Sequence, residues 1–261
     1  MGIMTAAEPR AEFETREPDG NVSLLLRGAG IVGILAAIVF FALPEIDLKT
    51  SAFFYRGHGV FSGKGGGIFA GGPPSTLSDF IRLGFYGAFV IVCGLTAFGL
   101  AASLIRKSPI FGLTTLKWLF LGTCLAVGPG LVGNVILKDH WGRARPVHLT
   151  EFGGSKTYSP PLLPSNQCDR NCSFVAGEAS MMYATFFAAA FVFPAIGRSL
   201  ILAGVLAGLL SGLVRISQGA HFLSDVIFAG VAMALTVAGI YLLFRAISRT
   251  LGNPLPQWCA W

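Results

Sequence analysis

Six long apolar stretches without a charged residue divide this chain, and polar segments separate them. Each stretch approaches the ~20 residues that a helix needs to cross the hydrocarbon core of a bilayer. The fifth is short, but arginines flank it and can extend their side chains to the interface. The pattern predicts an all-α polytopic membrane protein with six transmembrane helices in a bundle, over 28–44, 83–105, 118–137, 179–197, 199–214 and 226–244.

The composition agrees with this class of protein. Hydrophobic residues make up 53% of the chain and charged residues 12%, about half the share in a typical soluble domain, and the mean hydropathy is +0.67. The first span is not expected to be a signal peptide, because its leader is long and five further spans follow. Lysines and arginines near span ends account for the net charge of +6, so no nucleic-acid partner is expected.

One membrane domain, 28–247, lies between polar tails at 1–27 and 248–261. Its two long loops are 45–78, which is rich in Gly and Pro and is expected to hold little regular structure, and 138–175. Six spans return both termini to the same side. Lys and Arg near the span ends favour the cytoplasm for the termini, which places both long loops on the opposite face.

Cys168 and Cys172 lie four residues apart in one polar loop. This spacing allows a small disulfide loop in an oxidising compartment or two free thiols. A zinc site would need further ligands, for which His140 and His148 are the nearby candidates. The spacing leaves these three alternatives open.

A lysine and an arginine flank the start of the second long loop. Lys138 stands six residues before Arg145-Pro146, and cations of this kind neutralise a phosphate ester, with arginine matching two oxygens at once. Anchoring at a span end also explains Lys138, but Arg145 lies further into the loop. Arg143 between them is expected at the surface, or else as a fourth phosphate ligand.

Arg215, His221 and Asp225 form a second cluster after the fifth span. On a helix, His221 and Asp225 at i and i+4 would face each other. A carboxylate that binds one ring nitrogen leaves the other free as a nucleophile. A polar histidine at the interface explains His221 alone, whereas an unpaired aspartate at the mouth of a span is costly. We therefore expect a catalytic pair, with Arg215 as a phosphate ligand.

These two motifs, Lys-x6-Arg-Pro and Arg-x5-His-x3-Asp, resemble those of the type 2 phosphatidic acid phosphatase superfamily of membrane lipid phosphatases, over about residues 30–245. The resemblance implies a six-helix fold and hydrolysis of a phosphomonoester through a phosphohistidine, without metal or cofactor. It assigns His221 as nucleophile, Asp225 as its partner, and Lys138, Arg145 and Arg215 as phosphate ligands.

The motif between them departs from the family pattern. Where the family has Pro-Ser-Gly-His, this chain has Val175-Ala176-Gly177-Glu178. Gly177 is retained, and its N–H at a helix start can bind an anion. Glu178 occupies the place of the histidine that the family uses as general acid.

Three interpretations of Glu178 stay open. It could be the acid itself, with its pKa raised by burial. It could be a first-turn glutamate that the helix dipole favours, with water protonating the leaving group. The chain could also be inactive. The variant segment is similar to that of a proteobacterial branch, the lipid A 4'-phosphatase-like proteins, which favours a working enzyme.

The sequence thus predicts a multi-pass lipid phosphatase of the bacterial inner membrane with its active site facing the periplasm. A lipid A-type phosphate is the first choice of substrate, and isoprenoid pyrophosphate or phosphatidylglycerophosphate comes next. Transfer of the phosphate to an acceptor lipid would share the same intermediate. A non-catalytic lipid-phosphate binding or transport protein is the alternative, but binding alone has no use for the His221–Asp225 pair.

Overall fold

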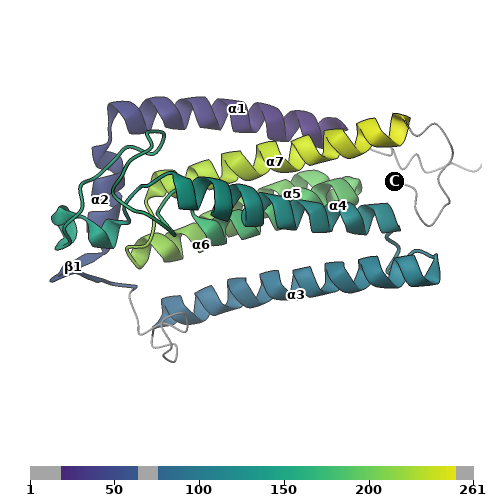
Figure 1. Ribbon diagram of the computed structural model, residues 1–261, viewed down its shortest axis with the longest axis horizontal. Helices are drawn as coiled ribbons and strands as arrows, with labels where there is room; N and C mark the ends of the chain where they lie inside the picture. Colours follow the sequence, from purple (N-terminus) through teal and green to yellow (C-terminus); the bar gives the residue numbers. More distant parts are fainter. Residues whose placement is uncertain (1–18, 64–75, 251–261) are drawn as a thin grey trace, which may run out of the picture.

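The structure is a computed structural model, and it describes residues 19–63 and 76–250. Within these residues the chain is helical apart from loops and one short hairpin, which confirms the all-α class. Long helices run side by side along the long axis of the molecule (Figure 1). They are α1 (Asp19–Ala42), α3 (Leu77–Arg106), α4 (Thr115–Leu125), α5 (Gly177–Val192), α6 (Gly197–Ser217) and α7 (Leu223–Thr250).

The third predicted span changes helix type midway. From Leu125 the chain continues without a break into η2 (Ala126–Lys138), a wider π-helix that contains Pro129 and three glycines. Proline lacks the N–H of a normal α-helical bond, and π-helical segments are common at functional sites. The last residue of η2 is Lys138, so this helix carries the first predicted phosphate ligand.

Within the described residues, five helices are long and apolar enough to cross a membrane. They correspond to five of the six predicted spans: Gly20–Ala42, Leu77–Arg106, Thr115–Lys138, Pro194–Ser217 and Leu223–Ile247. The remaining prediction, 179–197, falls on α5, which has 16 residues. Such a helix is about 24 Å long, short of a typical hydrocarbon core. The predicted span is longer than the helix because Pro194 prevents α5 from continuing. Pro194 is instead the first residue of a separate 3₁₀ turn, η5 (Pro194–Ile196).

The first polar segments differ from expectation. α1 begins at Asp19, so the last part of the predicted polar tail is helical, while residues 1–18 lie outside the described structure. The loop 45–78 was expected to hold little regular structure, and this is wrong for its first part. Glu45 opens the ten-residue helix α2 (Glu45–Phe54), where acidic residues in the first turn suit the helix dipole.

A tight hairpin follows α2. Strands β1 (Tyr55–Gly57) and β2 (Val60–Phe61) pair antiparallel. The turn is possible because Gly57, His58 and Gly59 all adopt positive φ, which glycine does without strain. The Gly-rich remainder, 64–75, lies outside the described residues.

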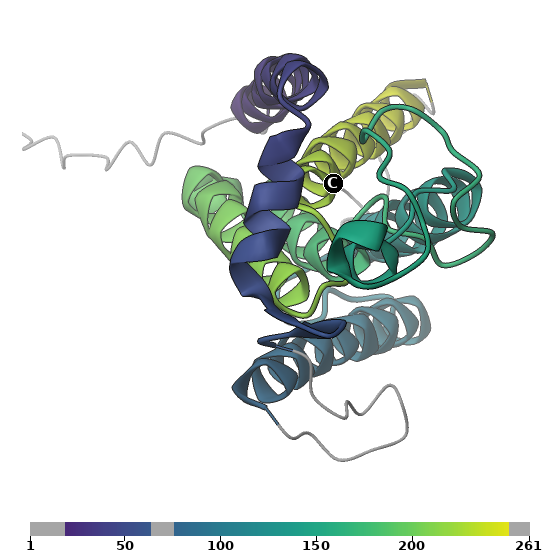
Figure 2. The same cartoon turned by 90° about the vertical axis from the view of Figure 1, so that its left-hand side faces the viewer.

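α5 is the centre of the bundle. It packs against α6, α7, α4 and η2, and eleven of its sixteen residues are buried. α1 and α3 lie on opposite sides of the molecule, as the view along its long axis shows (Figure 2). The beginning of α5 is therefore enclosed by the ends of its neighbours.

Close packing of α6 depends on three glycines spaced four residues apart. A side chain at Gly204 would meet Phe187, one at Gly208 would meet the Tyr183 ring, and one at Gly212 would meet Val226 at the start of α7. Small residues at this spacing let helices approach closely in a membrane. The contact at Gly212 brings the end of α6 against the beginning of α7, where the Arg-His-Asp motif lies.

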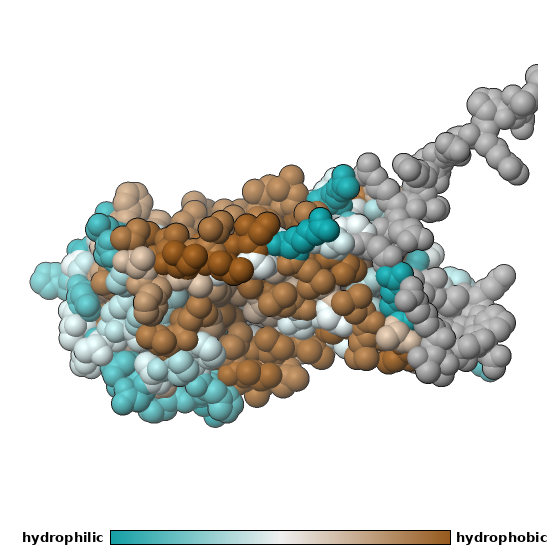
Figure 3. Space-filling view, turned by 90° about the horizontal axis from the view of Figure 1, so that it is seen from above, coloured by the Kyte–Doolittle hydropathy of each residue, from teal (hydrophilic) through white to brown (hydrophobic). Residues whose placement is uncertain are grey.

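The outer surface is apolar across the middle of the molecule. Exposed side chains there include Ile34, Ile91, Leu202 and Leu243, each more than half exposed. Hydrophilic residues gather at the end that carries α2 and the 138–175 loop (Figure 3). The distribution is that of a protein embedded in a bilayer with one polar end.

Candidate active site

The predicted motifs meet at this polar end of the bundle. The end of η2 supplies Lys138, the beginning of α5 supplies Gly177 and Glu178, and the end of α6 supplies Arg215. Two direct contacts link these segments. Glu178 pairs with Arg215, and a side chain at Gly177 would lie 2.9 Å from Nζ of Lys138. The predicted convergence of the three motifs on one face is confirmed.

His221 lies in the connection between α6 and α7, and it is 98% buried. The expectation that it shares a helix with Asp225 is wrong, because α7 begins at Leu223. Nδ1 of His221 lies 2.7 Å from the backbone carbonyl oxygen of Ser173, and 3.7 Å from Oδ2 of Asp225. A carbonyl oxygen only accepts, so Nδ1 carries the proton and Nε2 keeps its lone pair.

Asp225 lies in the first turn of α7, and its carboxylate accepts two hydrogen bonds and forms an ion pair. Its Oδ2 accepts hydrogen bonds from the hydroxyl of Ser173 at 2.5 Å and from the backbone N–H of Phe222 at 2.8 Å. The second bond caps the helix. Its Oδ1 pairs with the guanidinium of Arg143. Asp225 therefore orders the surroundings of His221 more than it holds the ring directly.

Arg143 is the centre of a buried charged network. Its side chain has no exposed surface, so the expectation of a surface charge is wrong. One guanidinium nitrogen bonds Asp225 and Ser224, and the other lies 2.8 Å from Oδ2 of Asp47 in α2. The Phe222 ring lies against the guanidinium plane, 4.3 Å from its centre. Planar stacking and a fixed fork of donors make arginine suited to such a site.

Asp47 joins the same network from α2. Its two oxygens accept bonds from the N–H of Ser224 at 2.9 Å and from its hydroxyl at 2.5 Å. The Tyr158 hydroxyl donates to Asp47 at 3.2 Å. Thus α2, the 138–175 loop and the beginning of α7 are fastened together by one arginine and two aspartates.

Burial and neighbouring charges shift the ionisation of these groups. Burial lowers the pKa of His221 to about 4, and the charges of Lys138 and Arg145 act in the same direction. Burial raises the pKa of Asp47, against the opposing effect of Arg143. Burial would lower the pKa of Arg143, but its two aspartates outweigh that effect and raise it. His221 is accordingly a neutral imidazole at physiological pH.

Glu178 lies between two guanidinium groups. Its Oε1 is 2.7 Å from Nη2 and 2.8 Å from Nε of Arg82 in α3. Its Oε2 is 3.4 Å from Nε of Arg215. Two cationic partners stabilise the ionised carboxylate, so in this arrangement Glu178 binds cations and does not hold a proton.

Arg215 is 92% buried, and the nearest carboxylate oxygen to its Nε is Oε2 of Glu178, at 3.4 Å. One terminal nitrogen bonds the side chain of Gln218, which in turn reaches Ser78 at the start of α3. Its Nε–H has no hydrogen-bond partner among the described residues. A buried guanidinium N–H of this kind is satisfied by an anionic oxygen such as that of a phosphate.

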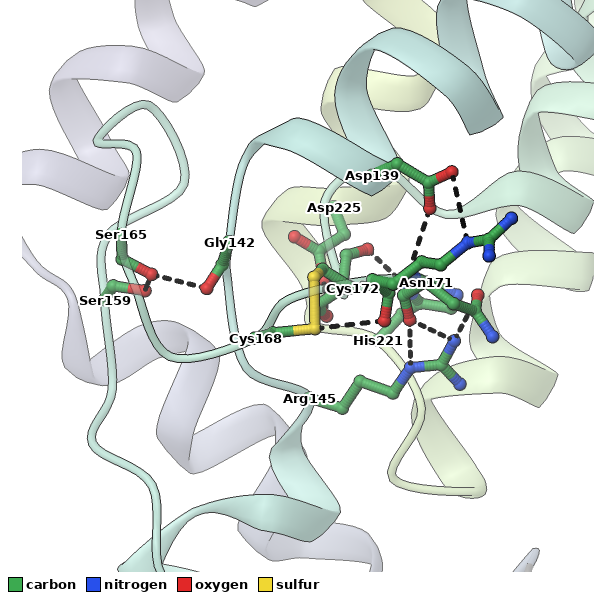
Figure 4. The surroundings of a disulfide bond; sticks show 12 residues. Asp139, Gly142, Arg145, Ser159, Ser165, Cys168, Asn171, Cys172, His221 and Asp225 are labelled. Atoms are coloured by element: carbon green, nitrogen blue, oxygen red, sulfur yellow. Dashed lines mark hydrogen bonds and ion pairs between the residues drawn. A yellow bond between two sulfur atoms is a disulfide. The ribbon is translucent and has the colours of Figure 1, made fainter.

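Arg145 is held by a neighbouring loop that a disulfide closes. Its Nε and Nη2 donate to the backbone oxygen of Asn171 at 3.2 and 2.8 Å, and Nη2 also donates to the Asn171 side chain at 2.8 Å. Cys168 and Cys172 are joined by a disulfide on either side of that residue (Figure 4). Of the three alternatives for this cysteine pair, the disulfide is confirmed.

No group of His, Cys, Asp and Glu within 19–63 and 76–250 is arranged to hold a metal ion. His140, one of the candidate zinc ligands, instead lies 2.7 Å from the Val135 carbonyl through Nδ1. The donors that converge on the site are cationic nitrogens, which suit an anion.

Four participants were missed by the sequence argument: Asp47, Arg82, Asn171 and the orienting role of Ser173. Arg143 was considered, but its place in a buried network was not predicted. Asp47 and Arg82 each give one signal that could have been used. Each is a charged residue within about two turns of a span end, on the side that carries the motifs. Intramembrane and boundary charges of this kind mark functional sites.

The site is a neutral, buried histidine surrounded by lysine and arginine side chains, in a helical membrane protein. The sequence pattern of the PAP2 superfamily matches residues 115–249, and the chain belongs to this superfamily. That range includes every predicted site residue, while Asp47 and Arg82 come from the segment before it.

Three curated relatives resemble the chain over most of its length. It is 36% identical to the lipid A 4'-phosphatase of Francisella tularensis subsp. novicida, over 82% of this chain and 92% of that protein. It is 32% identical to the lipid A 4'-phosphatase of Rhizobium etli, over 78% of this chain and 81% of that protein. The protein of the same name from Rhizobium leguminosarum is also 32% identical, over 78% and 90%. No solved structure matches the chain at a comparable level.

Proposed function

We propose that this protein removes the 4'-phosphate of a lipid A-type lipid, the reaction for which its curated relatives are named. It is a membrane lipid phosphatase, a phosphoric monoester hydrolase. The single observation that carries the proposal is the state of His221. Its Nδ1 proton is donated to Ser173, which leaves Nε2 free to attack phosphorus, and the cations of the motifs surround it.

The reaction has two displacements. Nε2 of His221 attacks phosphorus, the bond from phosphorus to the lipid oxygen breaks, and the lipid oxygen leaves with a proton as an alcohol. Water then attacks the phosphohistidine, the phosphorus–nitrogen bond breaks, and inorganic phosphate leaves. Lys138, Arg145 and Arg215 hold the equatorial oxygens throughout, with the N–H of Gly177 at the start of α5, and this positioning supplies most of the catalysis.

Glu178 is proposed as the group that protonates the leaving oxygen. It becomes able to do so when Arg82 and Arg215 exchange its carboxylate for the phosphate of the substrate. Arg215 and Arg82 stabilise its carboxylate form before substrate binds. An incoming phosphate dianion attracts the same guanidinium groups more strongly, and its charge then favours the protonated form of Glu178. The proton so acquired is the one that the lipid oxygen takes.

α5 is proposed as a sixth transmembrane segment, although it is short. Its neighbours enclose it, so it does not need to span the lipid by itself. With six segments both termini lie on one side, and the bias of Lys and Arg places that side in the cytoplasm. The site would then face the periplasm of a bacterial inner membrane, and a disulfide beside it suits an oxidising compartment.

The proposal is tested by release of inorganic phosphate from purified protein in detergent. The panel contains lipid A with its 4'-phosphate, phosphatidylglycerophosphate and an isoprenoid pyrophosphate, each with and without EDTA. We expect turnover of lipid A, unaffected by EDTA and abolished in His221→Ala. Phosphate release that EDTA removes would overturn the metal-free mechanism. Lipid-phosphate binding without turnover in the intact protein would favour the binding or transport alternative.

A further inference from the structure

The five-residue loop closed by the disulfide rests on both ends of the Lys-x6-Arg-Pro motif. The N–H of Cys172 donates to the carbonyl of Lys138 at 3.0 Å. The N–H of Asn171 donates to Oδ1 of Asp139 at 3.0 Å, and Asn171 receives the guanidinium of Arg145. Figure 4 shows Asn171 between the Asp139 carboxylate and Arg145. The loop therefore joins the two residues that begin and end the motif.

Asn171 holds the Arg145 guanidinium by one edge. Three hydrogen bonds reach two Asn171 oxygens, and they use Nε and Nη2 only. Nη1 bonds to none of the described residues, so its two N–H groups stay available to an anion. Three bonds to one residue fix the plane of the guanidinium, which determines where the remaining donors point.

The conformation of Asn171 depends on the loop around it. Its φ is +52°, in the left-handed region that asparagine tolerates better than most residues. This turn points both the carbonyl and the side-chain oxygen at Arg145. The disulfide between Cys168 and Cys172 closes the chain on either side, with Cα atoms 5.7 Å apart. A closed loop this small has few alternatives to that turn.

We propose that Asn171 is a positioning residue for the phosphate ligand Arg145, and that the Cys168–Cys172 disulfide keeps it in place, so phosphate affinity falls when the disulfide is reduced. The inference rests on the proposed function for the role of Arg145. It adds a dependence of substrate affinity on the redox state of the compartment.

Two measurements test this on the full-length protein in detergent. The first is binding of inorganic phosphate by calorimetry, which needs no turnover. The second is the KM and kcat for the lipid substrate. Each is made for wild type with and without dithiothreitol, for Asn171→Gly, and for the double variant Cys168→Ser/Cys172→Ser. Asn171→Gly keeps the disulfide and the turn but removes the side-chain bond. Asn166→Ala is the matched control, because Asn166 lies in the same long loop and its side-chain oxygen accepts a hydrogen bond from Gln167.

We expect the reduced wild type and the double variant to bind phosphate about tenfold more weakly, with a similar rise in KM and a smaller change in kcat. Asn171→Gly should show a smaller rise in the same direction, and dithiothreitol should not change the double variant further. Equal phosphate affinity in all forms would overturn the inference, even if turnover is normal. Failure of the wild type to release phosphate from any lipid would instead count against the proposed function, and the calorimetry would still decide the inference.

Discussion

The backbone carbonyl of Ser173 accepts the Nδ1 proton of His221 at 2.7 Å, a shorter contact than the one between His221 and Asp225. The carbonyl cannot ionise, so the ring is held in one tautomer at any pH at which it is neutral. Asp225 acts through Ser173 and Arg143 instead, because it receives the Ser173 hydroxyl and the Arg143 guanidinium. The orientation of His221, the proposed nucleophile, is therefore set by the segment that precedes α5.

The activity of the free enzyme should persist to unusually low pH. Burial lowers the pKa of His221 from 6.5 to about 4, and only the neutral ring can attack phosphorus. We expect the acidic limb of kcat/KM that His221 causes to lie near pH 4. Stability falls in the range where activity still persists: between pH 6.5 and about 4 the unfolded chain binds more protons than the folded one, so the free energy of unfolding decreases as the pH falls through that window. A pH–rate profile with its acidic limb at 6.5 would contradict this assignment.

Loss of the Ser173 hydroxyl should lower activity less than loss of the charge on Asp225, the residue to which it donates. Ser173→Ala removes the bond to Asp225 and keeps the carbonyl that orients His221. We expect kcat to fall roughly tenfold, the equivalent of one lost buried hydrogen bond. Asp225→Asn should cost more, because Arg143 also loses a counter-charge. Steady-state phosphate release measures both, and equal losses in the two variants would contradict the hierarchy.

Arg143 should stabilise the protein strongly. Arg143→Met leaves the carboxylates of Asp47 and Asp225 buried without a cation, and breaking a buried pair in this way costs about 3–5 kcal/mol. The thermal midpoint in detergent should fall accordingly. Arg170→Met is the control, because the Arg170 side chain is 87% exposed and its ion pair with Asp139 is 4.0 Å long. Similar midpoints in the two variants would show that the network contributes little.

Glu178→Gln should lower both KM and kcat, KM because phosphate binds more tightly and kcat because the proton donor is lost. Glutamine keeps the shape of the side chain but no longer competes with phosphate for Arg82 and Arg215. We expect a lower KM, tighter inhibition by inorganic phosphate, and a severe loss of kcat because the proton donor is gone. Glu151→Gln in the exposed part of the loop is the control. Unchanged kcat in Glu178→Gln would remove Glu178 from the reaction.

Gly177→Ala should weaken phosphate binding through Lys138. The added methyl group would lie 2.9 Å from Nζ of Lys138, so the lysine side chain must move away from the start of α5. A rise in KM of roughly three- to tenfold is expected from the loss of a well-placed charged donor. Gly94→Ala in α3 is the matched control, since a side chain there meets nothing within 4 Å. Equal KM values in the two variants would show that Lys138 does not need its present position.

Much of the fold could be predicted because long apolar stretches admit few structures in a membrane. Five of the six predicted spans correspond to helices that are long and apolar enough to cross a membrane. The predicted span at 179–197 extended beyond α5 because apolar residues continue past Pro194, where a separate 3₁₀ turn begins. The helix α2 was not predicted, because the many Gly and Pro residues of segment 45–78 indicated a loop without regular structure. The residues that α2 buries are the polar Asp47 and Ser51, so no apolar stripe marks the helix. Asp47 becomes buried only through partners that are distant in sequence.

The common location of Lys138, Arg145 and Arg215 could be predicted from the spacing of the motifs, and their role as phosphate ligands stays a prediction. The roles of other site residues could not be predicted, because contacts between segments distant in sequence determine whether these residues are buried and what they bind. Nothing in the local sequence separates Arg143 from an exposed loop arginine, and its contacts with Asp47 in α2 and Asp225 in α7 show that it is buried. Arg82 pairs with a residue 96 positions away. Asn171 contacts Arg145 because its own backbone adopts a positive φ within the loop that the Cys168–Cys172 disulfide closes.

The network around Arg143 also sets an order of events in biogenesis. Its members come from α2 near the beginning of the chain, from the loop after η2, and from α7 at the end. Helices can enter a bilayer one after another as they are synthesised, but this pocket needs the last of them. A chain whose α7 is not yet synthesised therefore lacks the contacts that order the segment of His221, the proposed nucleophile, so we expect phosphatase activity only when translation of the membrane domain is complete.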